Sequence, residues 1–155
     1  MPDLLIETHC DDWVIGIDEA GRGPWAGPVT AAAFWINPNC FDELPLELND
    51  SKKLSPAKRA LIFAALTGGE HAFNVVSIAA AEIDRIGING ATFLAMRQAA
   101  TKLQALLISR WNAAISLCLV DGTVDPDLGM PIETVIKGDT VSCSIAAASI
   151  IAKET

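Results

Sequence analysis

The chain has 155 residues, about half of them apolar (51%), and a net charge of −8. This length and composition are typical of one globular domain, and no apolar run reaches the roughly 18 residues that a membrane-spanning helix needs. The acidic balance argues against a nucleic-acid partner without excluding one, because only the surface along a bound strand has to be basic.

The beginning of the chain and its cysteines narrow the class of protein further. The first residues are acidic where a secretory leader would be basic, so we expect a cytoplasmic protein with no membrane partner. No internal repeat or linker is found, which predicts a single domain over residues 1–155 whose first 12 residues are irregular. No Cys-x-x-Cys pair occurs, which favours buried free thiols over zinc or disulfides at Cys10, Cys40, Cys118 and Cys143.

An apolar run from Trp13 predicts a strand that ends in two adjacent carboxylates, Asp18 and Glu19. A glycine-rich loop, Gly21-Arg22-Gly23-Pro24, follows at once. Adjacent side chains of a strand point to opposite faces, so the two carboxylates can share a site only if the strand ends or bends between them. We therefore expect the strand to end at Asp18.

The next segments predict two more strands and a helix. Residues 29–36 and 71–78 are expected to continue the first strand into an antiparallel meander. Between them, Ser55-Pro56 is an N-cap followed by proline at the first helical position, which predicts a helix to about Leu66. Lys52-Lys53 lies just before this helix, and its spacing alone favours a solvated basic turn over a phosphate contact.

The second half of the chain alternates helices and strands. Apolar residues that recur at every third or fourth position predict the longest helix. In chain order we expect a short helix over 79–86 that ends at Gly87, the long helix over 91–111, strands over 115–121 and 132–136, and a last helix beginning near 140–142.

Carboxylates follow the apolar strands at positions that suggest chemistry. The first strand ends near Asp18 and Glu19, a later one ends in Asp121-Gly122, and Asp139 lies at a strand-to-helix turn. Strand ends of a mixed sheet meet at its carboxyl edge, where ligands bind. Hard oxygen ligands without His or Cys favour Mg²⁺ or Mn²⁺, and phosphodiester hydrolysis is the reaction that suits them.

Purely structural roles are an alternative at these positions. Any one of the acids can be a turn former, and periodicity does not show that they converge. Trp25, beside the glycine-rich loop, can stack on a base or cap the core, and the sequence does not choose between the two.

Five motifs occur in sequence from about Trp13 to the end of the chain. They are Asp18-Glu19-Ala20-Gly21-Arg22-Gly23-Pro24, Leu48-Asn49-Asp50-Ser51-Lys52-Lys53-Leu54, Val120-Asp121-Gly122, Lys137-Gly138-Asp139 and Ala147-Ala148-Ser149-Ile150-Ile151-Ala152-Lys153. Together they resemble bacterial ribonuclease HII. The resemblance implies an α/β, ribonuclease H-like fold, a mixed central sheet flanked by helices.

The resemblance also implies the reaction and its residues. The family cleaves the RNA strand of RNA–DNA hybrids and nicks DNA duplexes at an embedded ribonucleotide, leaving 3′-hydroxyl and 5′-phosphate ends. By this resemblance two divalent metal ions, Mn²⁺ or Mg²⁺, position the water and stabilise the leaving oxygen. The family's four carboxylates fall on Asp18, Glu19, Asp121 and Asp139. The 2′-hydroxyl is read by Gly21, Arg22 and Gly23, largely through backbone groups, and Lys52 and Lys53 gain a phosphate role.

Three departures from the family pattern accompany this resemblance. Ala146 stands where many relatives have serine, the chain has no tyrosine to stack at an RNA–DNA junction, and relatives continue for several helical turns past Lys153. We expect a monomeric endonuclease. The alternatives are a truncated, catalytically weak form that binds hybrids and a general acidic-site phosphohydrolase on the same fold.

Overall fold

A computed structural model describes residues 1–10, 13–23 and 27–155, so the predictions for Pro24 and Trp25 fall outside the described residues. Five strands form one mixed sheet in the order β3-β2-β1-β4-β5. The meander of β1, β2 and β3 is antiparallel, as predicted, whereas β4 runs parallel to both β1 and β5. The strands are β1 (Val14–Ala20), β2 (Val29–Trp35), β3 (Ala72–Ile78), β4 (Leu117–Asp121) and β5 (Ile132–Val135).

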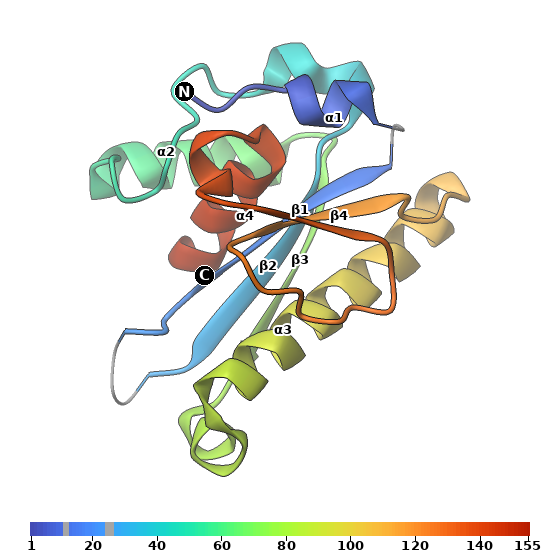
Figure 1. Ribbon diagram of the computed structural model, residues 1–155. Helices are drawn as coiled ribbons and strands as arrows, with labels where there is room; N and C mark the ends of the chain where they lie inside the picture. The colour runs from blue at the N-terminus through green and yellow to red at the C-terminus, as the bar shows by residue number, and fades with distance from the viewer. Residues whose placement is uncertain (11–12, 24–26) are drawn as a thin grey trace.

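Helices cover both faces of the sheet (Figure 1). On one face α3 packs against β2 and β3, and on the other α4 packs against β1 and β2, with α2 beside it. The helices are α1 (Leu5–His9), η1 (Pro38–Glu43), α2 (Pro56–Gly68), α3 (Ala80–Trp111), η2 (Gly138–Thr140) and α4 (Cys143–Glu154). Among the described residues, no helix is long and apolar enough to cross a membrane.

Alternation along β1 divides its side chains between the two layers. Ile15 and Ile17 are fully buried in the cluster that includes α3. Gly16 faces the other way, onto α4, where a Cβ atom would lie 2.2 Å from the backbone carbonyl carbon of Ser144. The absence of a side chain at Gly16 therefore lets the first turn of α4 rest directly on the strand.

Several predicted boundaries need correction. Residues 1–12 are not all irregular, because α1 forms there and the buried Glu7 carboxylate accepts hydrogen bonds from Ser142 Oγ (2.5 Å) and Ser144 N (2.9 Å) at the start of α4. The predicted break at Gly87 is confirmed by its φ of +82°, but helix resumes directly after it instead of at residue 91. The short helix η1 was not predicted.

The predicted cap of α2 and the predicted thiols are both found. The Ser55 side chain accepts a hydrogen bond from Lys58 N, and Pro56 is the first helical residue. All four cysteines are free, and three of them are buried, whereas Cys10 is only half-buried. Burial raises the pKa of the Cys118 thiol to about 12, so this side chain stays protonated and inert at neutral pH.

Candidate active site

Asp18 and Glu19 lie at the carboxyl end of β1, and the expected strand end between them is wrong. β1 keeps its register with β2 through both residues and ends only at Ala20. Asp18 is buried (6% exposed) and accepts a hydrogen bond from the Ser149 hydroxyl of α4. Glu19 projects to the opposite face. Both carboxylates nevertheless line one pocket of about 270 Å³ at the carboxyl end of β1.

Asp121 enters the same pocket from the neighbouring strand. It is the last residue of β4, and its Oδ1 accepts a hydrogen bond from Gly138 N at 2.6 Å. A Cβ atom on Gly138 would lie 2.5 Å from Ile145 Cδ1 and 3.3 Å from Asp121 Oδ1, so a side chain at this position would require the buried Ile145 side chain to shift. The turn after β5 thereby fixes the orientation of the Asp121 carboxylate.

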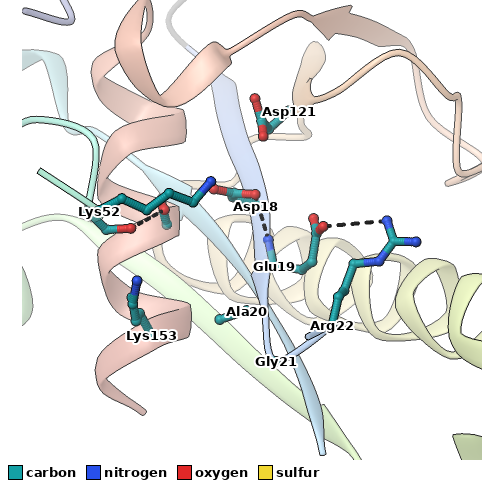
Figure 2. Close-up of a pocket in the computed structure, with 10 residues that line it drawn as sticks. Asp18, Glu19, Ala20, Gly21, Arg22, Lys52, Asp121 and Lys153 are labelled. Carbon is teal, nitrogen blue, oxygen red and sulfur yellow. Dashed lines mark hydrogen bonds and ion pairs between the residues drawn. The ribbon is translucent and has the colours of Figure 1, made fainter. Parts of the chain in front are cut away.

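Cationic side chains frame this acidic pocket (Figure 2). Lys52 reaches toward Asp18 from one side, and the Arg22 guanidinium meets the Glu19 carboxylate at 3.7 Å on the other. Lys153 of α4 also lines the pocket, a position that had no assigned role in the sequence although it ends the last motif. A pocket that joins carboxylates to cations suits a phosphate ester with a metal ion.

The structure brings most, but not all, of the predicted site residues to this pocket. Its lining includes six of them, namely Asp18, Glu19, Gly21, Arg22, Lys52 and Asp121. Within the described part of the chain, Gly23, Lys53 and Asp139 are not among the lining residues. The sequence missed Ser51 and Ser149, whose hydroxyl oxygens lie 3.0 Å apart beside Asp18.

Burial and like charges govern the electrostatics of the pocket. The pKa of Asp18 is raised well above its ordinary value by burial, and next by the charges of Asp121 and Glu19. The pKa of Glu19 is raised by burial and by Asp121, against the opposing effect of the Arg22 charge. The carboxylates thus repel one another in the folded chain, and a bound cation would relieve that repulsion.

Asp139 lies in η2, is not among the residues that line the pocket, and is 7% exposed. Its pKa is raised to about 6 by burial, then by the charges of Asp50 and Asp121, and by a hydrogen bond with the Asp50 side chain. The nearby Lys52 charge opposes this shift. Asp139 is therefore electrostatically connected to Asp121, although its immediate neighbour is Asp50.

The glycine-rich loop begins beside the carboxylates. Gly21 has a φ of +93°, and a Cβ atom there would lie 2.3 Å from the carbonyl oxygen of Pro28, so this position requires glycine. Arg22 is held by Asn89 of α3, whose Oδ1 accepts from Nη2 at 2.6 Å. No atom lies within 4 Å of a Cβ built on Gly23, which leaves its backbone accessible.

The donor set suits a hard divalent cation, but the carboxylates do not form a finished cluster. Among the described residues, no three His, Cys, Asp or Glu side chains make a group that could hold a metal ion. Glu19 is turned toward Arg22, and Asp121 toward Gly138 N. Burial raises the pKa of Asp18 most, and the charges of Asp121 and Glu19 raise it further; this additional repulsion is the property expected of residues that share a cation.

Comparison with known proteins identifies the family of this chain. The family model described as Ribonuclease HII matches residues 15–155. The chain belongs to the ribonuclease HII family. Members of this family are metal-dependent endoribonucleases that cleave RNA in RNA–DNA hybrids. The Ribonuclease HII of Gluconobacter oxydans (strain 621H) is 46% identical over 156 residues, which span all of this chain and 72% of that protein.

Solved structures confirm the ribonuclease H-like fold. The ribonuclease H2 from Pyrococcus horikoshii OT3 is similar with a TM-score of 0.74 and 27% identity, over 90% of this chain and 70% of that one. Bst-RNase HIII in complex with Mn²⁺ has a TM-score of 0.75 at 23% identity, a likeness of fold alone. The match covers 90% of this chain and half of the Bst chain.

Proposed function

We propose that this ribonuclease HII chain hydrolyses the RNA strand of RNA–DNA hybrids and nicks DNA duplexes at an embedded ribonucleotide. The observation that carries the proposal is the placement of three carboxylates and of residues 21–23, of which Arg22 and Gly23 are exposed, at one end of β1. Hydrolysis of the phosphodiester and recognition of the ribose then take place at neighbouring groups. Such a reaction leaves 3′-hydroxyl and 5′-phosphate ends.

The residues of the loop and the cations bind the substrate. Backbone groups of Gly21 and Gly23 approach the ribose 2′-hydroxyl, the group that distinguishes RNA from DNA; a Cβ atom on Gly23 would meet no atom within 4 Å, and the positive φ of Gly21 sets the course of the loop beside the carboxylates. Arg22, held by Asn89, contributes to the same contact. Lys52 beside the carboxylates and Lys53 in the same exposed turn bind phosphates of the nucleic acid.

The carboxylates hold the metal. Asp18, Glu19 and Asp121 would serve as ligands, and Asp139, whose charge interacts with that of Asp121, would complete the charge of the site. When bound, Mn²⁺ or Mg²⁺ supplies charge stabilisation for the phosphodiester and activates the attacking water. Gly138 N keeps Asp121 oriented, and Ser149 does the same for Asp18. The Mn²⁺ complex of the structurally similar Bst-RNase HIII supports this choice of metal.

The test is cleavage of a DNA duplex that contains one ribonucleotide, with Mn²⁺ or Mg²⁺ added. We expect one nick at the ribonucleotide and none in the all-DNA duplex. Asp121→Asn is expected to lower the rate by roughly a hundredfold or more, because even partners of metal ligands cost 10- to 100-fold. Asp84→Asn, an exposed acid on α3, is the matched control and keeps full activity.

Two results would overturn the proposal. Cleavage of small phosphate esters without cleavage at a ribonucleotide would instead indicate a general phosphohydrolase. Binding of the hybrid without turnover would indicate a hybrid-binding protein. The expectations of a single-domain, monomeric and cytoplasmic protein are proposals as well, and the mass of the protein in solution by light scattering checks the monomer.

A further inference from the structure

Arg59, in the first turn of α2, makes contacts that no motif anticipated. Its Nε donates to Glu154 Oε1 in the last turn of α4 at 2.5 Å. Its Nη1 donates to two backbone carbonyl oxygens of the preceding turn, those of Ser51 at 3.2 Å and Leu54 at 3.3 Å. The side chain is only 15% exposed, and its charge is balanced by Glu154. The mostly buried Arg59 side chain therefore links α2 to α4 and to the turn that precedes α2.

The turn that Arg59 holds spans residues 51–54 and carries both lysines of the proposed phosphate contact. Asp50 shapes this turn, because its Oδ1 accepts from Lys52 N and its carbonyl oxygen accepts from Lys53 N, both at 2.9 Å. Ser51 ties the turn to Ser149 of α4, which hydrogen-bonds to Asp18. The turn and the carboxylates are thus parts of one connected arrangement.

We propose that Arg59 is a positioning residue for substrate binding, which holds the 51–54 turn against α4 so that Lys52 and Lys53 meet the phosphates beside the carboxylates. This inference rests on the proposed function. We do not assign Arg59 a phosphate contact of its own, since Nε and Nη1 are engaged in these three hydrogen bonds, its side chain is only 15% exposed and its charge is paired with Glu154.

The shape of the guanidinium explains why arginine occupies this position. Its planar fork presents donors in fixed directions, so one side chain reaches a carboxylate and two carbonyl oxygens at once. A lysine ammonium has the same charge but a single nitrogen, and it cannot span the three acceptors. Arg59→Lys therefore preserves charge while it loosens the turn.

The kinetic test uses Arg59→Lys on the duplex with one ribonucleotide. We expect KM to rise roughly three- to tenfold, with kcat within about twofold of wild type, because phosphate contacts govern affinity. In a Lys52→Ala/Lys53→Ala background, Arg59→Lys is expected to add nothing, since it acts through those lysines. Lys58→Ala is the control, because among the described residues this neighbouring cation forms its ion pair with the exposed Glu47 and not with the 51–54 turn.

A second measurement does not depend on cleavage. Hydrogen exchange of the 51–54 amides, in the protein without metal or substrate, is expected to accelerate in Arg59→Lys and stay unchanged in Lys58→Ala. If Arg59→Lys does not fold, as judged by circular dichroism, Glu154→Gln weakens the same contact and replaces it in both measurements.

The outcomes separate this inference from the proposed function. A wild-type protein that does not cleave defeats the proposed function, and the exchange rates then still decide whether Arg59 holds the turn. If the wild type cleaves, the inference is overturned by unchanged exchange, by a loss confined to kcat, or by effects that add to those of the lysine substitutions.

Discussion

Asp18 and Glu19 are neighbours on β1, yet their surroundings differ. Asp18 points into the α4 side of the sheet, where it is almost fully buried and bound by a hydroxyl and by the backbone N of Glu19 at 2.8 Å. Glu19 points to the α3 side and contacts Arg22, whose side chain is 44% exposed. The buried side of the site is fixed by packing, whereas the open side is set by a surface contact that a substrate can rearrange.

The largest effect is expected from a substitution on the buried α4 side of the site, at Gly16. Gly16→Ala would place a methyl group 2.2 Å from the backbone of Ser144, where no rotamer change relieves the overlap. We expect a loss of about 3 kcal/mol or more in the free energy of unfolding, measured by urea denaturation. Gly68→Ala, with no atom within 4 Å, is the control and is expected to be neutral or slightly stabilising.

The pH dependence of stability gives a second test of the buried side of the site, through Asp139. The pKa of Asp139 is raised to about 6, so the folded chain binds more protons there than the unfolded chain does. Its contribution to the stability of the metal-free protein therefore declines as pH rises from about 4 to about 6, and it levels off above that range.

The pH dependence of the melting temperature checks this sign. Asp139→Asn is expected to remove part of the decline, so the variant gains a few degrees relative to wild type at pH 7 but not at pH 4. Added Mg²⁺ is expected to raise the wild-type melting temperature at pH 7. If the difference in melting temperature between Asp139→Asn and wild type falls as pH rises, the raised pKa of Asp139 is wrong.

The smallest effect is expected on the open side. Asn89→Ala removes the hydrogen bond that holds Arg22 and leaves the carboxylates untouched. We expect KM for the ribonucleotide-containing duplex to rise about two- to threefold, with the melting temperature unchanged, because only one exposed side chain loses its order. A large fall in kcat would show that Glu19 depends on this contact more than its exposure suggests.

Local signals explain why much of the fold could be predicted from the sequence. The Ser55-Pro56 cap, the break at Gly87 and the alternation of the first three strands each depend on a few adjacent residues. Helix α1 was missed because five residues have little helical propensity of their own. Its stability comes from the contact of Glu7 with the start of α4, two segments that are far apart in the sequence.

The site was predictable to the extent that its residues follow strands. Asp18 and Asp121 meet because β1 and β4 are parallel neighbours, which strand-end reasoning anticipated. The continuation of β1 past Asp18 and the contacts of Ser149 and Arg59 were not predictable, because they depend on how α2 and α4 pack on each other.

The direct contact between Gly16 and the start of α4 has a consequence for the order of folding. The strand β1 (Val14–Ala20) bears two of the carboxylates, and the helix that encloses Asp18, α4 (Cys143–Glu154), follows much later in the sequence. A cation-binding pocket with this geometry exists only after these two segments, which are far apart in the sequence, have come together. Metal binding is thus expected to stabilise the whole folded chain. The affinity for the metal then reports the fraction of molecules in which β1 and α4 are in contact.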